Sequence, residues 1–311
     1  MPQTINTNIV SLNAQRNMSS AQSSLATSMQ RLSSGLRVNS AKDDAAGLAI
    51  AERMSSQVRG MNVAVRNAND GISLAQTAEG ALGKIGDNLQ RMRELAVQSR
   101  NATNSTGDRA NLQKEFKELQ DEIKRTVSNT SFNGTKLLNG SSGDLAIQVG
   151  ANTTGDDKIT ITGVDMNGTA SLTDAVATDP TTSTAAVVLA TAFSAQSDDA
   201  EGLAIGGKMN DGSTDVAVGD IDTAINVIDK ALDRVNEQRA TFGATQNRLE
   251  AVISNLNVNI ENQSAARGRI MDADFATETA NLSRSQILQQ AGNAMIAQAN
   301  QLPQQVLSLL R

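Results

Sequence analysis

The sequence of 311 residues contains no cysteine, histidine, tryptophan or tyrosine, and only five phenylalanines. Without cysteine and histidine the chain has no zinc site of the usual kind, no thiol nucleophile and no Ser-His-Asp triad. Aromatic residues make up 2% of the chain, which argues against a large ligand pocket, because such pockets are usually lined by rings. We therefore expect a structural protein, with no catalytic residues, no cofactor and no metal. A hydrolase that uses carboxylates alone is the remaining enzymatic alternative.

The charges are distributed unevenly. The formal net charge is −6, and an acidic balance argues against nucleic acid as a partner, because nucleic-acid-binding surfaces are basic. The first acidic residue is Asp43 and the last is Glu278, so neither end of the chain contains a carboxylate side chain. This pattern arises either by chance or because the two ends share one environment.

Membrane and targeting signals are absent from the sequence pattern. No segment approaches the ~20 consecutive apolar residues that span a bilayer. The first residues have neither the positive region nor the apolar run of a signal peptide. We expect no membrane partner and no cleaved signal peptide.

Hydrophobic periodicity predicts long helices toward both ends. Apolar residues recur at spacings of three and four over 18–36, 78–96 and 112–127, and two interleaved seven-residue series run over 221–260 with polar breaks at Arg239 and Gln246. The same pattern returns over 288–309, and with three prolines in the whole chain little interrupts these helices. The two ends are predicted to pair as an antiparallel coiled coil. The apolar positions of its coiled-coil seam are Leu25, Met29, Leu32, Leu36, Leu288, Met295, Leu302 and Val306.

The middle of the chain loses this periodicity. Asn-Gly pairs at 133–134 and 139–140 predict turns, and alternation over 145–149 and 159–161 predicts a β-hairpin. Residues 166–215 are rich in Thr, Ser, Ala, Asp and Gly and are interpreted as a short, variable, surface-exposed insertion, so that deletion of 170–210 should be tolerated. The predicted fold is mainly α, with long antiparallel coiled-coil helices from both chain ends and a β-hairpin region and insertion between them.

A break is predicted near residue 40. Ser40 and Asp43 have the spacing of a capping box with Ser40 as the N-cap residue, and 33–43 is interpreted as a non-helical or frayed connector. Asp43 and Asp44 form an adjacent carboxylate pair, which placement at a helix N-terminus explains better than metal or acid–base chemistry.

Five segments of the sequence resemble bacterial flagellin. They are LSSGLRVNSAKDDAAGLAI at 32–50, RNANDGISLAQTAEGA at 66–81, LQRMRELAVQS at 89–99, FNGTKLL at 132–138 and AQANQLPQQVLSLLR at 297–311. The resemblance covers about 1–165 and 216–311. It implies the structural subunit that self-assembles into the extracellular flagellar filament for swimming motility. The alternative is a hook–filament junction protein of the same superfamily.

The resemblance also implies a division into domains. The terminal coiled-coil arms would comprise 1–43 and 268–311, and the helical core with its β-hairpin would comprise 44–165 and 216–267. The insertion would be 166–215. Because each arm has one thin apolar seam, we expect both arms to be disordered in the free monomer and to fold when neighbouring arms supply a partner surface.

Partners follow from the same resemblance. They are other copies of the chain in a helical homopolymer, a flagellar export chaperone at the C-terminal arm, the filament cap and hook-junction proteins, and the animal Toll-like receptor for flagellin. The receptor or subunit contact is assigned to Arg91, Leu95 and Glu115, and the same face is alternatively a contact between filament subunits. Export is expected to occur through the type III channel.

Overall fold

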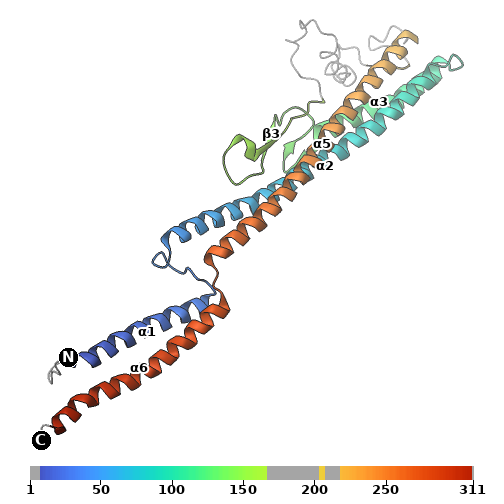
Figure 1. Cartoon of the computed structure of the whole chain (residues 1–311). Coiled ribbons are helices and arrows are strands. Elements are labelled where there is room, and N and C mark those ends of the chain that lie inside the picture. The colour runs from blue at the N-terminus through green and yellow to red at the C-terminus, as the bar shows by residue number, and fades with distance from the viewer. Residues whose placement is uncertain (1–7, 167–202, 207–217, 310–311) are drawn as a thin grey trace. The chain divides into compact units, whose positions relative to one another are not determined.

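The structure, a computed structural model of the chain, describes residues 8–166, 203–206 and 218–309 (Figure 1). The side chains of 218–220 and 302–309 are not part of that description. The chain divides into two compact units, a terminal unit of 1–59 with 259–311 and a central unit of 60–258. Each unit is described by itself below.

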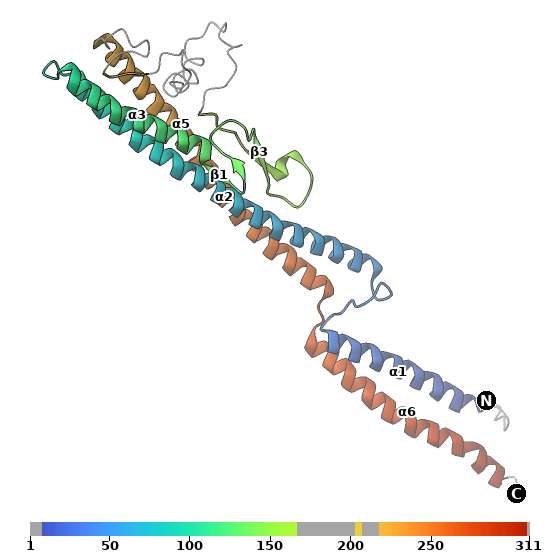
Figure 2. The ribbon, with the colours of Figure 1, turned by 180° about the vertical axis from the view of Figure 1, so that it is seen from behind.

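In the terminal unit, helices α1 (Ile9–Ser34) and α6 (Phe275–Leu309) lie side by side and antiparallel (Figures 1 and 2). The side chain of Asn8 caps α1 by accepting from the Ser11 N–H at 3.1 Å, and its amide donates to the Ala299 carbonyl on α6 at 2.7 Å. The α1 helix ends at Gly35, whose φ of 71° is the left-handed conformation that glycine adopts most easily. The predicted pairing of the two chain ends is confirmed.

Beyond Gly35, the chain forms a connector that is held by backbone hydrogen bonds. The Arg37 N–H donates to the Met271 carbonyl at 2.6 Å, and the Ala273 N–H donates to the Gly35 carbonyl at 2.9 Å. The side chains of Val38, Ala51 and Met271 form a small buried cluster here.

Helix α2 (Ala45–Ser99) begins later than the sequence indicated. The carboxylate of Asp44 accepts from the Gly47 N–H at 2.8 Å, as an N-cap side chain does. Ser40 and Asp43 form a turn instead, in which the Asp43 carboxylate accepts from the Ser40 N–H at 2.9 Å and from the Ser40 hydroxyl at 3.0 Å. The prediction of Ser40 as the N-cap was therefore wrong, because Asp44 offers an acceptor at the same spacing four residues later.

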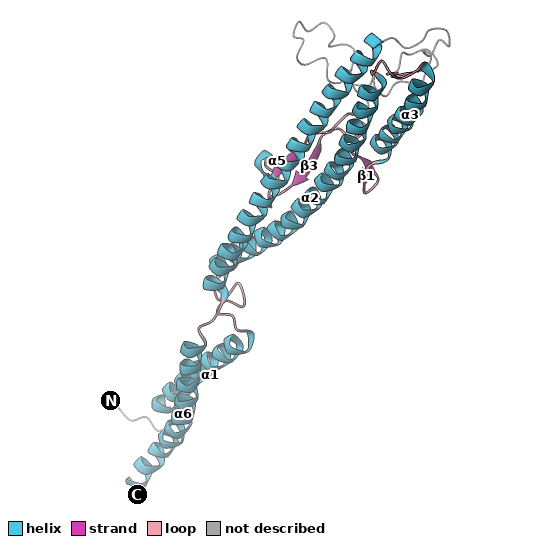
Figure 3. Ribbon diagram, turned by 90° about the vertical axis from the view of Figure 1, so that its right-hand side faces the viewer, coloured by secondary structure: helices cyan, strands magenta, loops and turns pink. Residues whose placement is uncertain are grey.

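In the central unit, α2, α3 (Thr106–Asn129) and α5 (Val218–Met271) run alongside one another (Figure 3). Their apolar faces meet in one core, because residues spaced by three and four share a side of each helix. A capping box starts α3, where Ser105 and Asp108 each accept from the other's backbone N–H. The largest fully buried side chains of the three helices are Leu82, Ile85, Leu89, Met92, Leu95, Phe116, Ile123 and Ile221.

Two antiparallel hairpins lie between α3 and α5 in the sequence. Strands β1 (Ser131–Phe132) and β2 (Thr135–Lys136) are joined by a turn with positive φ at Asn133 and Gly134. Strand β3 (Leu145–Gln148) pairs with β4 (Lys158–Ile161), preceded by the short helix η1 (Gly155–Asp157), which confirms the predicted hairpin. Val149 and Ile159 pack on Ala68 of α2 and Leu249 of α5.

Parts of the predicted insertion at 166–215 belong to the core. Met166 and Ile205 are fully buried among the side chains of the three helices. The expectation of a surface-exposed segment is therefore wrong for Met166 and for 203–206, and most of the remaining insertion lies outside the described residues. Composition concealed this, since two apolar residues among many small polar ones give no periodic signal.

Candidate subunit and partner surfaces

The contact between α1 and α6 is made by small and polar side chains. Among the described side chains of these two helices, the buried ones are Ser11, Ala21, Ser28, Glu278, Ser285 and Ala299. The Ser11 hydroxyl donates to the Asn300 side chain at 2.9 Å. A small-residue contact lets two backbones approach closely, but it removes little apolar surface from water.

Large apolar side chains of the same helices face solvent instead. Eight are exposed, namely Ile9, Val10, Leu12 and Met29 on α1 and Phe275, Ile287, Leu288 and Met295 on α6. An apolar surface of this extent is characteristic of an interaction surface rather than of a finished monomer surface.

The predicted coiled-coil seam is divided between these two environments. Leu25, Leu32 and Leu36 are half-buried, whereas Met29, Leu288 and Met295 are exposed. The side chains of Leu302 and Val306 lie outside the described residues. The seam thus does not form a closed interface within one chain.

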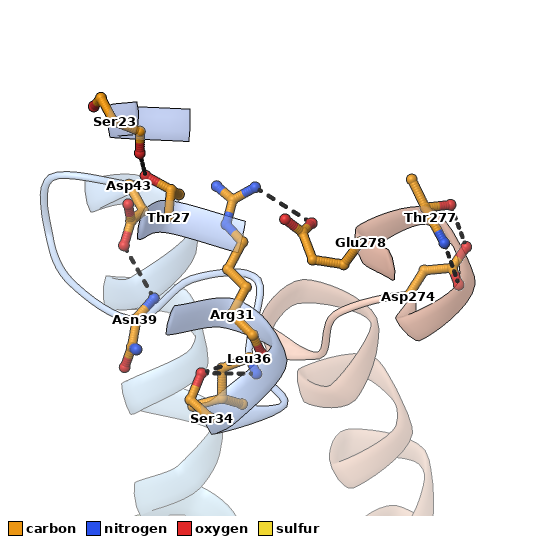
Figure 4. Close-up of polar contacts among 10 residues, drawn as sticks. All are labelled: Ser23, Thr27, Arg31, Ser34, Leu36, Asn39, Asp43, Asp274, Thr277 and Glu278. Atoms are coloured by element: carbon orange, nitrogen blue, oxygen red, sulfur yellow. Dashed lines mark hydrogen bonds and ion pairs between the residues drawn. The ribbon is translucent and has the colours of Figure 1, made fainter. Parts of the chain in front are cut away.

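One ion pair joins α1 to α6 where the helices approach the connector. The Nη1 atom of Arg31 lies 3.9 Å from Oε2 of Glu278, and Figure 4 shows the two side chains pointing toward each other. The Glu278 side chain is 10% exposed, so its charge depends on this partner more than a solvated carboxylate would. A groove beside the pair is lined by residues of both helices, including Asn17 and Arg284.

Two carboxylates organise the chain next to this pair. Asp274 accepts from the Ala276 N–H at 3.0 Å and from the Thr277 hydroxyl at 2.7 Å at the start of α6 (Figure 4). Hydrogen bonds from the Thr277 side chain and backbone, and from Ala276, lower the pKa of Asp274 below its usual value. Backbone and side-chain hydrogen bonds from Ser40 likewise lower the pKa of Asp43. Both carboxylates serve local structure.

On the central unit, Arg91 of α2 is paired with two glutamates. It lies 2.9 Å from Glu94 and 2.9 Å from Glu115 of α3, and all three side chains are exposed. Hydrogen bonds to Glu94 and Glu115 raise the pKa of Arg91 above its usual value. Arg91 and Glu115, which the sequence placed in one contact site, are adjacent here.

Leu95 lies elsewhere. Its side chain is 1% exposed and belongs to the core of the three helices. It is therefore not an apolar anchor on the surface of the isolated chain, although the sequence grouped it with Arg91. The exposed apolar residue of this stretch is Val97, which the sequence analysis did not single out.

Two further ion pairs join α5 to the end of α2 and to the residue that follows it. Arg93 lies 2.6 Å from Asp229, and Arg100, directly after α2, lies 2.7 Å from Asp222. Hydrogen bonds from Arg93 to Asp229 raise the pKa of the arginine. Both pairs are exposed, so each contributes little to the free energy of unfolding. Their main effect is on the register of α5 against α2.

The described residues contain neither a membrane-spanning helix nor a metal-binding cluster. None of the described helices is long and apolar enough to cross a membrane. Residues 8–166, 203–206 and 218–309 contain no group of three side chains that could hold a metal ion.

Comparison with known protein families gives two matches. Residues 5–143 match the bacterial flagellin N-terminal helical region, and residues 225–310 match the bacterial flagellin C-terminal helical region. The two matched regions contain α1 and α6, the arms whose contact was described above.

Similar proteins match the chain over its length. A flagellin of Xenorhabdus nematophila is 47% identical over 318 residues, covering 100% of both chains. Flagellin A of Vibrio cholerae (El Tor Inaba N16961) is 41% identical over 380 residues, covering 99% of both. A putative flagellar hook-associated protein from Vibrio parahaemolyticus superposes with a TM-score of 0.55 at 13% identity, over 74% of this chain and 100% of that one.

Proposed function

The chain belongs to the bacterial flagellin family, and on that premise we propose that the exposed apolar faces of α1 and α6 form the contacts between subunits. As a flagellin, the chain is a structural protein that homopolymerises into the flagellar filament of motile bacteria, and it is not an enzyme. The hook–filament junction alternative finds no support, since the likeness to a hook-associated protein at 13% identity reflects a shared fold alone.

The observation that supports this assignment is the distribution of side chains around the arm pair. The buried residues between α1 and α6 are small or polar, while Ile287, Leu288 and Met295 are exposed, and Leu288 and Met295 line the open groove between the two helices. Burial of apolar surface contributes about 25 cal/mol per Å², so arms that expose these side chains gain free energy when neighbouring arms cover them. Because residues 1–42 and 279–311 contain no carboxylate side chain, many copies of these segments can also pack without repulsion between carboxylates.

The experiment is assembly of the full chain carrying Ile287→Ser and Met295→Ser together. Both residues are exposed in the single chain, so the substitutions should leave the central unit folded but remove apolar surface from the subunit contact. We expect no tubes by electron microscopy after seeding. The matched control is Gln290→Ser, an exposed polar position on the same helix. Normal tubes from the double variant would refute the assignment.

We further propose that the arms, 1–43 and 268–311, fold fully only on assembly. The described side chains bury only Ala21 and Ala299 as apolar residues in the α1–α6 contact, whereas ordering the backbone costs about 1–2 kcal/mol per residue. Limited proteolysis should shorten the monomer from both ends to a fragment of about 50–265 and leave filaments intact. Protease resistance of the monomer's ends would contradict coupled folding.

Export and capping partners are proposed for the same arms. A C-terminal arm that exposes Phe275, Ile287 and Leu288 offers an amphipathic helix of the kind that partner proteins bind in a groove. We assign it to the flagellar export chaperone, with export that requires no cleaved signal peptide. The filament cap and hook-junction proteins are proposed to contact the same arms at the filament ends. A chain without 280–311 should lose chaperone binding in a pull-down.

The surface around Arg91 and Glu115 is proposed as the contact for the animal Toll-like receptor. An exposed arginine at the junction of two helices suits an interface anchor. The same surface is alternatively covered by a neighbouring subunit in the filament. Because both uses need the same side chains, the receptor would then read soluble monomer in preference to filament.

A further inference from the structure

The tetrapeptide Leu203–Gly206 lies on the core of the central unit. The chain on both sides of it, 167–202 and 207–217, is outside the described residues, so this segment is described by its contacts with the helices of the core. We name Leu203, Ala204, Ile205 and Gly206 the clip. The side chain of Ile205 is fully buried, and Leu203 and Ala204 are partly buried against the same core.

The backbone of the clip is bound by side chains from two helices. The Ser99 hydroxyl at the end of α2 donates to the Ile205 carbonyl, and the Gln113 side-chain oxygen of α3 accepts from the Ile205 N–H at 2.7 Å. The Gln120 amide, about two turns further along α3, donates to the Leu203 carbonyl at 3.4 Å. Ser99 is fully buried, so its hydroxyl would be costly to leave unpaired.

Two positions of the clip accept only certain residues. Ile205 fills a place within the core, where a smaller or polar side chain leaves a void or an unpaired group. At position 206, a Cβ atom would lie 2.2 Å from the Arg109 carbonyl oxygen. Only glycine allows that approach without a shift of α3.

We propose that Ser99, Arg109, Gln113 and Gln120 form a peptide-binding site that is selective for a short segment with a buried apolar residue followed by glycine, and that the clip is its tethered ligand. Backbone hydrogen bonds supply the affinity and the two selective positions supply the specificity. The proposal concerns a site within the central unit and does not depend on how subunits assemble.

Tethering explains how four residues remain bound. A tetrapeptide with one buried side chain binds weakly on its own, but attachment through the flanking chain raises its effective concentration to about the millimolar range. Because its own contacts are with the helices, the clip can stay bound when the chain before it changes in sequence or length. A free peptide of the same sequence should occupy the site when the tethered clip is disabled.

The first experiment measures hydrogen exchange of the full chain at the Ile205 amide. Gln113→Ala removes its acceptor and should raise exchange at Ile205 at least tenfold while the α3 amides remain protected. The matched control is Lys117→Ala, an exposed position on the same helix, which should leave the Ile205 rate unchanged. An Ile205 amide that exchanges as fast in the unchanged chain as in Gln113→Ala would overturn the proposal.

The second experiment tests binding in trans. The full chain with Leu203→Ser and Ile205→Ser is titrated with the synthetic peptide AEGLAIGGK, residues 200–208 of this sequence, and Ile and Leu methyl shifts of the core are followed by NMR. We expect saturable shifts around Ser99 and Phe116 and none with a peptide that has serine in place of Ile205. Absence of saturable shifts at millimolar peptide, or equal shifts with both peptides, would overturn the proposal. If the variant does not fold, Gly206→Ala, which crowds Arg109 and keeps Ile205, replaces it in the same titration.

Discussion

The Arg31 guanidinium of α1 lies 3.9 Å from the Glu278 carboxylate of α6. Glu278 is the last acidic residue of the sequence, and within the described residues this is the ion pair that joins the two arms. Because the carboxylate is mostly buried, the α1–α6 contact contains one charge that needs its partner.

Removal of one partner should therefore be worse than removal of both. Glu278→Ala leaves the Arg31 charge in a partly buried place without its partner, which is unfavourable. We expect a several-fold higher critical concentration for assembly, measured by sedimentation. The double variant Arg31→Met with Glu278→Met should restore assembly. Equal defects in the single and double variants would show that the pair is needed for another reason.

The receptor surface yields a second prediction, because Arg91 and Leu95 differ in burial. Arg91→Ala should weaken receptor signalling by soluble monomer several-fold and leave the melting temperature unchanged, since the side chain is exposed. Leu95→Ala should destabilise the chain by about 2–5 kcal/mol, the usual cost of deleting a buried leucine side chain. The measurements are a dose response in receptor-bearing cells and thermal unfolding.

Arg125→Ala is the control for the loss of an exposed arginine. Arg125 also pairs with a glutamate, since it lies 2.6 Å from Glu122 on α3, and this substitution removes that pair. Arg125 lies outside the proposed contact. A dose response that Arg91→Ala leaves unchanged would remove this surface from the receptor assignment.

A third prediction concerns acid pH. Hydrogen bonds from the Ser105 side chain and backbone lower the pKa of Asp108, so this carboxylate stabilises the folded chain above the pKa it has when unfolded. That stability is lost as the pH falls below about 4. Asp108→Asn, which cannot titrate, should make unfolding less dependent on pH between about 4 and 2. Identical pH profiles for both chains, measured by urea unfolding, would count against the capping box as a source of acid sensitivity.

A fourth prediction separates two deletions in the middle of the chain. Deletion of 170–202 should leave assembly and stability unchanged, because it retains Met166 and the clip. Deletion of 170–210 also removes Ile205 and should lower the melting temperature by several degrees, since it empties a place in the core. Circular dichroism and electron microscopy measure both effects. Equal melting temperatures would show that the clip contributes nothing to the core.

The sequence predicted the helices well because their signal is repeated many times. Positions such as Leu82, Ile85 and Leu89 recur at helical spacing and are all buried, and each repeat reinforces the others. The β3–β4 hairpin was also predicted, because alternation and turn residues occur together there.

Three features could not be predicted, each for a physical reason. The clip has one buried apolar side chain in four residues, which is too short for a periodic pattern. Leu95 lies one turn after Arg91 and only about 40° around the helix from it, so periodicity places both near the edge of the apolar face and does not tell which of the two the neighbouring helices cover. Ser40 and Asp44 both have capping chemistry, and the sequence cannot decide between neighbouring acceptors.

The two ion pairs between Arg93 and Asp229 and between Arg100 and Asp222 have a mechanical consequence. The arginines and the aspartates are each one heptad apart, so a slide of one helix past the other by one heptad would keep a single pair and leave the other two charges unmatched. The two pairs together therefore favour one register of α5 against α2. A subunit under tension along its length would have to break both pairs before α5 could move to a shifted register.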